Sequence, residues 1–471
     1  MQLSDSSSQI TNDARKILRS SSAAVAADRL VQKQLSLRDQ SLQIGANVYD
    51  LGDHQEILIV GAGKVSGQMA QPIVSLLSQG DAKHFRGWIN VPDTPDLPSL
   101  SPVSVCAARP LGANQPTEEV LFGTWEILRM LQSADPRALG IVLISGGGSA
   151  LLESPRMPLT LLDIAQISFE LSQAGFSIQE INLVRRQLSQ VKGGGLVRSF
   201  NGAKIHALIV SDVIGNTLAD IASGPTVGCH PQYQEAHQVV LQLQERTGGA
   251  NSEAVKKVIK FLEAEPPEAH LEKQDEVSVV NQIIGDNSMA VEVAKQQAKK
   301  MGYRVLATAE QIDPNANVLQ LAQQYAIQIE SLLHQDSPVC LITGGEPTLQ
   351  VPSSCGKGGR NQHLVLAVLQ YLKQRAPADS VSKLGINATH DFCFLSAGTD
   401  GEDGNTSVAG AYIDSAILER SNEEEIARAL QQFDSHNFFK QHELLLKPTE
   451  SKTNVCDIHI ALIRPRTASH H

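Results

Sequence analysis

The stretch Glu56-Ile-Leu-Ile-Val-Gly-Ala-Gly-Lys-Val-Ser-Gly67 decides the fold class of this chain. Its first part, Glu56–Val60, is a short apolar run typical of a strand that is buried on both faces of a parallel sheet. The run leads through a glycine-rich turn, 61–67, into a segment with helical periodicity. Strand, glycine turn and helix together form the repeating unit of an open α/β sheet. Because similar apolar runs recur at 140–144 and 207–210, we predict an α/β protein.

The length of 471 residues predicts two or three domains, at roughly 150 residues per domain. Charged residues are dense over 231–274, which we interpret as a helical connector, and a second α/β series begins with a predicted strand at 277–284. We therefore expect an N-terminal α/β domain over residues 1–240 and a C-terminal α/β domain over residues 241–471. The region 92–116 contains six prolines and is predicted to be largely loop.

Two helix starts between the second and third predicted strands can be located from capping patterns. Thr160-x-x-Asp163 and Ser177-x-x-Glu180 both resemble capping boxes, in which each end of the motif satisfies a free backbone N–H group of the other. We predict one helix after each motif.

The composition excludes several classes of partner. A formal net charge of −11 and an aromatic content of 4% argue against binding to nucleic acid. The longest uncharged apolar stretch, Ala138–Leu152, is too short to span a bilayer and contains three glycines. The six cysteines form no Cys-x-x-Cys pair, and the N-terminal residues lack a signal-peptide pattern. We expect a cytoplasmic monomer or homodimer with small-molecule partners and without nucleic-acid or membrane partners.

The first candidate site is the glycine turn that carries Gly61, Gly63 and Lys64. Backbone N–H groups at such a turn, together with the start of the following helix, attract anions. A dinucleotide-binding fingerprint would require glycine where Ser66 stands, and a P-loop would require Ser or Thr where Val65 follows the lysine. The alternative interpretation is a tight turn with a solvated lysine.

Two further candidate loops follow the predicted strands at 140–144 and 207–210. The first loop leaves room for a ligand and offers two hydroxyl groups; a flexible linker is the alternative. The second places Asp212 where open α/β sheets bind ligands, either as a base or as a ligand to a metal carried by a nucleotide. An aspartate that only caps a helix is the alternative there. The residues of the first loop are Ser145, Gly146, Gly147, Gly148 and Ser149.

The C-terminal half holds a comparable set of residues. Glu346 follows a predicted strand, and Gly356-Lys-Gly-Gly-Arg-Asn-Gln362 precedes a predicted helix that starts near Gln362. Asn361 suits the N-cap position, and Arg360 lies where free N–H groups already favour anions, so we predict a phosphate site; a basic surface loop is the alternative. Asp400 lies in an acidic, glycine-rich loop that lacks the spacing of an EF-hand.

Glycine-rich anion sites, basic residues and carboxylates at strand ends suit phosphoryl transfer, in which positioning and charge neutralisation dominate catalysis. The chain also resembles the glycerate 2-kinase family, the class II kinases with a C-terminal MOFRL domain, in nine ordered motifs between about residues 23 and 462. These motifs are Gly61-Ala-Gly-Lys64, Ser145-Gly-Gly-Gly-Ser-Ala-Leu-Leu152, Asn182-Leu-Val-Arg-Arg186, Lys192-Gly-Gly194, Ser211-Asp-Val-Ile-Gly215, Ala222-Ser-Gly-Pro-Thr226, Thr343-Gly-Gly-Glu-Pro-Thr348, Gly358-Gly-Arg-Asn-Gln362 and Gly398-Thr-Asp-Gly-Glu-Asp-Gly404.

The resemblance implies two α/β domains, the first a Rossmann-like three-layer sandwich, with the active site in the cleft between them. It implies ATP- and Mg²⁺-dependent phosphorylation of D-glycerate, or a close hydroxy acid, at the 2-hydroxyl. Lys64, Asp212 and Arg360 would be the catalytic residues: the two cations neutralise phosphoryl charge, and the aspartate orients or deprotonates the hydroxyl. The resemblance leaves the metal ligands undefined. It adds the following residues to the binding site: Lys192, Glu346, Asn361 and Asp400.

The chain departs from the family pattern at three places. Ala108-Arg-Pro110 replaces Gly-His-Pro, Ser407 stands where an acidic residue is expected, and the late motif at 447–455 has two extra residues. Two other functions therefore stay open. One is an NAD(P)H-dependent hydroxypyruvate reductase, which Ser66 and the lack of an acidic residue ending the predicted strand 87–91 disfavour. The other is a non-catalytic phosphometabolite-binding protein.

Overall fold

The structure is a computed structural model that describes residues 3–80, 84–94, 98–110, 115–228, 232–248, 252–264, 277–306, 313, 315–352, 354–375, 390–448 and 451–466. It divides into two compact units. The inserted unit comprises residues 27–285, and the split unit comprises residues 1–26 together with 286–471.

This division differs from the boundary near residue 240 that the sequence suggested. The segment predicted to open the second α/β series is β9 (Ser278–Gly285), and it pairs in parallel with β8 (Lys204–Val210) in the sheet of the inserted unit. At the other end, α1 (Leu3–Ala24) belongs to the split unit instead of the N-terminal domain. Both assignments depend on packing partners far away in the sequence.

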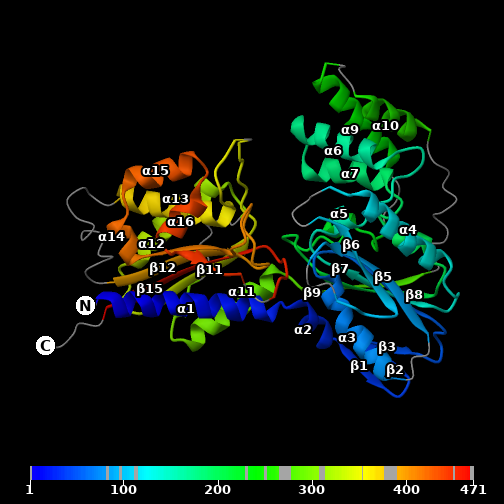
Figure 1. Ribbon diagram of the computed structural model, residues 1–471, viewed down its shortest axis with the longest axis horizontal. Coiled ribbons are helices and arrows are strands. Elements are labelled where there is room, and N and C mark those ends of the chain that lie inside the picture. Colours follow the sequence, from blue (N-terminus) through cyan, green and yellow to red (C-terminus); the bar gives the residue numbers. More distant parts are fainter. Residues whose placement is uncertain are drawn as a thin grey trace. The chain divides into compact units, whose positions relative to one another are not determined.

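The inserted unit is built on a six-stranded, entirely parallel sheet (Figure 1). Numbered along the chain, its strands lie in the order 3-2-1-4-5-6, which is the doubly wound arrangement. The crevice in such a sheet lies at the carboxyl ends of the first and fourth strands, where the direction of winding reverses. The strands before β8 are β4 (Ile57–Ala62), β5 (Phe85–Pro92), β6 (Val103–Arg109) and β7 (Leu139–Ile144).

Strand β6 lies within the region 92–116, which the sequence predicted to be largely loop. None of the six prolines lies inside the strand. Pro102 precedes it directly and Pro110 follows it directly. It is an edge strand of the sheet and pairs only with β5. A proline-bounded edge strand is compatible with the rule that proline avoids the interior of sheets.

Helices pack on the sheet of the inserted unit and extend beyond it. Helix α3 (Ser66–Gln79) contacts β4, β5 and β7, and α4 (Glu118–Gln132) contacts β4, β5 and β6. The smaller elements are α2 (Ala27–Gln32), a three-stranded antiparallel sheet of β1 (Leu35–Arg38), β2 (Ser41–Ile44) and β3 (Asn47–Asp50), α5 (Gly148–Leu151), α8 (Gly195–Ser199) and a 3₁₀ turn (Ile221–Ser223).

Four helices form a separate group with its own apolar core (Figure 1). Both predicted capping boxes are confirmed: Thr160 and Asp163 start α6, and Ser177 and Glu180 start α7. The predicted connector contributes α9 and α10 to this core and is therefore packed structure; its residues 231, 249–251 and 265–274 lie outside the described ranges. The helices are α6 (Leu161–Gln173), α7 (Ile178–Leu188), α9 (Tyr233–Arg246) and α10 (Glu253–Glu263).

The split unit contains a mixed six-stranded sheet in the order β10-β11-β15-β12-β13-β14. The last long strand, β15, lies between β11 and β12 and is antiparallel to both. Helices α1 and α11 cover one face, and α12 and α13 cover the other (Figure 1). The strands are β10 (Arg304–Val305), β11 (Val339–Gly345), β12 (His390–Gly398), β13 (Gly410–Asp414), β14 (Leu445–Leu446) and β15 (Asp457–Pro465).

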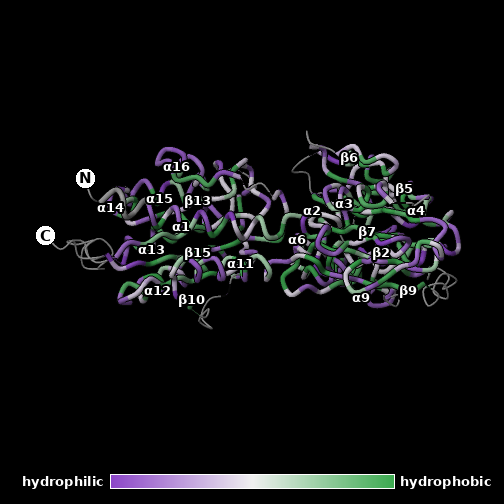
Figure 2. Tube along the Cα trace, turned by 90° about the horizontal axis from the view of Figure 1, so that it is seen from below, coloured by the Kyte–Doolittle hydropathy of each residue, from purple (hydrophilic) through white to green (hydrophobic). Residues whose placement is uncertain are grey.

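Each unit buries its strands among apolar side chains, and hydrophobic stretches run through both units (Figure 2). No helix within the described ranges has both the length and the apolar character that a membrane crossing requires. The two units thus confirm the expected α/β class. The remaining helices are α11 (Asn287–Lys300), α12 (Val318–Leu332), α13 (Arg360–Arg375), α14 (Ser415–Arg420), α15 (Glu423–Gln431) and α16 (Ser435–Gln441).

Candidate active site

The turns that follow β4 and β7 lie against each other at the switch point of the parallel sheet. The backbone N–H of Lys64 donates to the carbonyl of Gly146 at 2.9 Å. The N–H of Val65 donates to the Oγ of Ser145 at 3.1 Å, and the hydroxyls of Ser66 and Ser145 lie 3.0 Å apart. Two turns about 80 residues apart in sequence are therefore held together by hydrogen bonds. We call these joined turns, residues 61–67 and 145–149, the floor of the candidate site.

This close approach requires glycine at position 63. A Cβ atom there would lie 2.1 Å from the Oγ of Ser145 and 2.5 Å from its carbonyl oxygen, and the φ angle of Gly63 is 145°. A side chain would meet both a steric clash and an unfavourable backbone conformation. Gly61 is also buried in this floor.

Gly147 is the point around which the predicted catalytic residues of the inserted unit gather. Its N–H donates to the Oδ2 of Asp212 at 3.2 Å. A Cβ atom on Gly147, whose φ is 75°, would lie 3.6 Å from the Cγ of Lys64. The structure therefore brings Lys64 and Asp212 to the same glycine, from the ends of β4 and β8.

The two serines of the glycine loop serve different purposes. Ser145 is 1% exposed and its hydroxyl is used within the floor, so it offers little to a ligand. Ser149 is half-buried, and its hydroxyl lies 3.0 Å from that of Ser223. Gly146 and Gly148 are buried.

The charge of Lys192 is compensated within the inserted unit. Its side chain is fully buried and its Nζ lies 2.7 Å from the Oε2 of Glu153. The ammonium also donates to the carbonyls of Ser149 and Leu152 at 3.1 and 3.0 Å. Burial lowers the pKa of Lys192 to about 8, partly opposed by Glu153. These contacts tie Lys192 to the end of the glycine loop, and its expected role in ligand binding stays a prediction.

In the split unit, Arg360 is the first residue of α13 and is held by two carboxylates. Its Nε donates to Oδ2 of Asp457 at 2.6 Å and its Nη2 donates to Oδ1 at 3.2 Å, so the pair is bidentate. Its Nη1 donates to the Oε1 of Glu346 at 2.8 Å. These carboxylates raise the pKa of Arg360 above its ordinary value, against the opposing effect of burial. The guanidinium is thus fixed in orientation.

The backbone amides expected to hold a phosphate at the start of α13 are already bonded. The N–H groups of Asn361 and Gln362 donate to the two carboxylate oxygens of Asp403 at 3.0 and 2.9 Å. Burial raises the pKa of Asp403 to about 6, although these hydrogen bonds act in the opposite direction. Asn361 is 1% exposed and lies inside the helix, so it is not the predicted N-cap. A protein carboxylate occupies the place predicted for an anion.

Glu346 and Asp400 both follow strands of the split unit. Glu346 comes directly after β11 and its side chain is 49% exposed, while its backbone N–H donates to the Oδ1 of Asn315 at 2.9 Å. Asp400 comes after β12, and its Oδ1 accepts from the N–H of Glu402 at 3.1 Å. Glu346 is the residue of this pair that accepts the hydrogen bond from Nη1 of Arg360 described above.

Comparisons with known proteins match family models to two segments of the chain. Residues 13–263 match a domain of unknown function (DUF4147), and residues 339–457 match the MOFRL family. The chain is 33% identical to the glycerate kinase of Mus musculus, over 97% of this chain and 94% of that protein.

The chain belongs to the glycerate kinase family. It is also 28% identical to the glycerate 2-kinase of Pyrococcus horikoshii, over 94% of this chain and 95% of that protein. Among solved structures, the glycerate kinase of Thermotoga maritima matches with a TM-score of 0.74 at 26% identity, over 97% of this chain and 100% of that one.

Sequence reasoning missed two carboxylates that organise the split unit of this glycerate kinase family member. Asp457 is the first residue of β15, and it lies opposite Gly345 of β11 and Gly398 of β12. Asp403 lies in the acidic loop that was noted only as a poor calcium motif. Neither could be paired with Arg360 or with α13 from sequence, because the pairings span 97 and about 42 residues.

The strand after the first glycine turn ends differently from the prediction. Strand β5 runs to Pro92 and Asp93 follows it directly, so an acidic residue does end the second strand. What remains against the fingerprint is Ser66, whose hydroxyl donates to the carbonyl of Leu143 and lies beside Ser145. That serine ties the first turn to β7 where a third glycine would stand. Membership in the glycerate kinase family also favours phosphoryl transfer over reduction.

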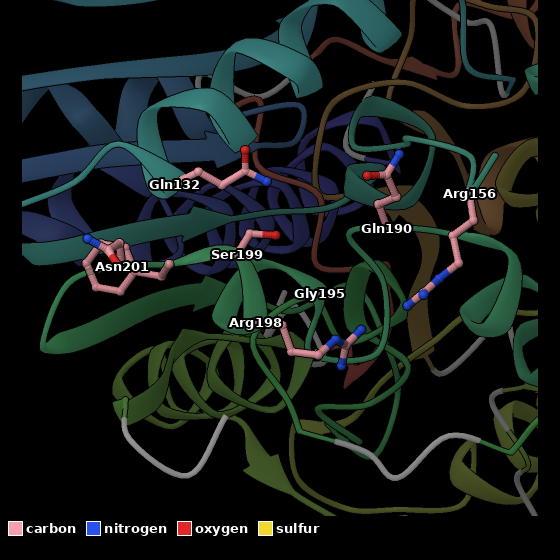
Figure 3. A pocket seen from close by; sticks show the side chains of 8 residues that line it. Gln132, Arg156, Gln190, Gly195, Arg198, Ser199 and Asn201 are labelled. Atoms are coloured by element: carbon pink, nitrogen blue, oxygen red, sulfur yellow. The ribbon is translucent and has the colours of Figure 1, made fainter. Parts of the chain in front are cut away.

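A polar cavity of about 260 Å³ lies elsewhere in the inserted unit (Figure 3). Its two arginines already donate to backbone carbonyls: Arg156 to Ser189 at 3.1 Å and Arg198 to Gly193 at 2.6 Å. None of its lining residues is a predicted site residue of this glycerate kinase family member. They are Gln132, Arg156, Gln190, Gly195, Arg198, Ser199, Phe200 and Asn201.

Proposed function

We propose that this glycerate kinase family member transfers the γ-phosphoryl group of ATP to the 2-hydroxyl of D-glycerate, giving 2-phosphoglycerate and ADP. The observation that carries the proposal is the meeting of Lys64 and Asp212 at Gly147, at the switch point of a parallel sheet. A cation, a carboxylate and a glycine-rich turn at this place supply what phosphoryl transfer requires. The names of the mouse and bacterial relatives support a glycerate kinase, and the name of the archaeal relative supports phosphorylation at the 2-position.

In the proposed reaction, the 2-hydroxyl oxygen of the acceptor attacks the γ-phosphorus of ATP and the bond to the ADP oxygen breaks. The hydroxyl proton passes to the carboxylate of Asp212, which the N–H of Gly147 holds in place. The ammonium of Lys64 compensates negative charge on the transferring group. We keep Arg360 as a proposed catalytic residue, because two carboxylates fix the orientation of its guanidinium.

Mg²⁺ enters the proposal with the nucleotide. This ion usually keeps several waters and binds through one or two carboxylates together with substrate phosphates, so it needs no preformed protein cage. Asp212 offers carboxylate oxygens of the right kind. Its chemical contribution would be to neutralise the charge of the phosphates.

We further propose that the protein acts in the cytoplasm as a monomer or homodimer on small molecules. The cysteines among the described residues are free thiols, which supports a reducing compartment. They are Cys106, Cys340, Cys355, Cys393 and Cys456.

The test is to incubate the purified protein with ATP, Mg²⁺ and D-glycerate and to identify the product by phosphorus NMR. We expect 2-phosphoglycerate and stoichiometric ADP from the natural chain, and neither from Lys64→Met or Asp212→Asn. Lys256→Met is a matched control, because Lys256 lies on α10 with its side chain 64% exposed. If a panel of small hydroxy acids yields no ADP above background, the proposed kinase function is wrong.

The same preparation tests the alternatives. NADH oxidation with hydroxypyruvate in the absence of ATP would support the reductase. Binding of phosphorylated acids without any turnover would support a non-catalytic binding protein.

A further inference from the structure

Arg109, the last residue of β6, carries a buried guanidinium for which the described residues provide no counter-ion. Its side chain is 5% exposed, and among the described residues none accepts a hydrogen bond from its Nε or Nη1. Burial lowers the pKa of this guanidinium from its ordinary value. Lys192 and Arg360, by contrast, each have a carboxylate partner at 2.7 Å or less. An unpaired buried cation is costly in free energy.

The guanidinium lies beside the same glycine that joins Lys64 to Asp212. A Cβ atom on Gly147 would lie 3.3 Å from the Nη2 of Arg109 and 3.6 Å from the Cγ of Lys64. The N–H of Gly147 donates to Asp212. Gly147 is therefore bordered by the side chains of Lys64, Arg109 and Asp212, and the lack of a side chain at Gly147 leaves room beside the guanidinium of Arg109.

The chemistry of this arrangement indicates a particular anion. A guanidinium is planar and donates two parallel hydrogen bonds, which match the two oxygens of a carboxylate or a phosphate. A 2-hydroxy acid carries its hydroxyl and its carboxylate on neighbouring carbon atoms. If the hydroxyl reaches Asp212, the carboxylate must lie within a few ångströms of it, and the guanidinium of Arg109 borders the same glycine as Asp212. The nucleotide phosphates have no such constraint.

We propose that Arg109 binds the carboxylate of the acceptor and thereby selects small 2-hydroxy acids over neutral alcohols. This assignment rests on the proposed kinase function and adds the residue that recognises the acid. The unpaired charge of the ligand-free protein is compensated when the substrate binds.

The test compares D-glycerate with D-glyceramide, which keeps the hydroxyls and lacks the charge. In Arg109→Gln we expect kcat/KM for D-glycerate to fall on the order of 10²-fold, because one partner of a buried charged pair is lost. We expect kcat/KM for the amide and KM for ATP to stay unchanged. Arg129→Gln is the matched control, since Arg129 is 49% exposed on α4. Arg109→Lys should restore only part of the preference, because lysine lacks the fork.

Two further measurements separate the possible failures. Calorimetric titration of D-glycerate without ATP should show weaker binding to Arg109→Gln than to the natural chain. The ligand-free melting temperature of Arg109→Met should rise, because an unpaired buried charge has been replaced by an apolar group of similar length.

A rise in KM for ATP with equal losses on both acceptors would assign Arg109 to the nucleotide and overturn the proposal. A lowered melting temperature with equal losses on both acceptors would indicate a structural residue and overturn it as well. If the natural chain forms no ADP with any acceptor, the kinase function itself fails. If it does form ADP but the variants keep both the preference and the binding, only the role of Arg109 fails.

Discussion

Arg360 donates two hydrogen bonds to Asp457 and one to Glu346, and this geometry depends on a planar guanidinium. Lysine keeps the charge but cannot reproduce three directed bonds. We expect Arg360→Lys to lower kcat of the proposed kinase on the order of 10²-fold, as for one electrostatic stabiliser, with little change in melting temperature. Steady-state kinetics and thermal unfolding of this one variant provide the check.

Asp457 gives a companion test of the same pair. Asp457→Asn should lower kcat in the same direction, because Arg360 then loses its bidentate carboxylate. Arg129→Lys, on the exposed face of α4, is the control and should leave kcat unchanged. An unaltered kcat in Arg360→Lys would remove Arg360 from the catalytic residues.

Lys192 and Glu153 form a fully buried pair with side chains 1% and 0% exposed. Removing one member leaves the other as an uncompensated charge, so we expect Lys192→Met to cost about 3–5 kcal/mol in the free energy of unfolding. The double variant Lys192→Met/Glu153→Gln should recover part of this loss. Urea denaturation measures both effects, with the exposed Lys256→Met as the control. A stable single variant with an altered KM for ATP would support a role for Lys192 in the binding site.

At the scale of secondary-structure elements, the junction of the β4–α3 turn with the β7 turn depends on Gly63. In Gly63→Ala the new methyl group would lie 2.1 Å from the Oγ of Ser145 at a φ of 145°. We expect a loss of at least about 3 kcal/mol of stability, measured by urea denaturation, through overpacking and backbone strain together.

Gly215→Ala is the matched control for this junction. Its φ is 85°, but no atom lies within 4 Å of the added Cβ, so only the conformational cost applies. That cost is about 1–2 kcal/mol. Equal losses in the two variants would show that the two turns are not packed as described.

Helix α13 contains a buried histidine that makes the split unit sensitive to acid. His363 is 4% exposed and stacks on Phe433 with ring centroids 5.0 Å apart, and burial lowers its pKa to about 4. Between pH 6.5 and about 4, the unfolded chain binds a proton that the folded chain does not. Stability therefore decreases as the pH falls through this window.

We expect His363→Phe to keep the stack and to remove up to about 3 kcal/mol of this acid sensitivity. The measurement is the free energy of unfolding at pH 7.5 and at pH 4.5. His334→Phe, at an exposed position, should not change the difference between the free energies of unfolding at these two pH values. An unchanged pH dependence in His363→Phe would contradict the assignment.

How far the elements could be predicted depended on whether the decisive contacts were local. The helix starts at Thr160 and Ser177 followed from bonds three residues apart and were confirmed. The position of β15 between β11 and β12, and of β9 beside β8, depends on pairing with distant segments. The same limit applies to the site: Lys64 and Asp212 follow strands and could be singled out, whereas the partner of Arg360 lies 97 residues away.

For the whole molecule, the division into an inserted and a split unit predicts how fragments behave. Residues 27–285 form an uninterrupted unit with its own parallel sheet and cores, so this fragment should fold alone with a cooperative urea transition. Residues 286–471 lack α1, which packs on α11, β12 and β15 in the full chain. We expect this second fragment to unfold or aggregate by itself.

A peptide of residues 1–26 should restore the second fragment when it is added in trans. Buried bonds that it would re-form include Arg464 to Asp13 at 2.6 Å and the Oγ of Ser21 to the carbonyl of Ala290 at 2.7 Å. Circular dichroism and size-exclusion chromatography give the result. A fragment 286–471 that folds without the peptide would show that α1 is dispensable.

The order of the units along the chain also determines when each element becomes available for packing during synthesis on the ribosome. Helix α1 emerges first, but β12 and β15 lie more than 360 residues later, which at roughly 5–20 residues per second is a delay of about 20–70 s. The inserted unit is complete at Gly285 and can fold during this interval. Helix α11, which also packs on α1, ends at Lys300, so α1 meets its partners β12 and β15 only when synthesis is nearly finished. We therefore expect the nascent chain to carry α1 without its full set of packing partners for most of its translation.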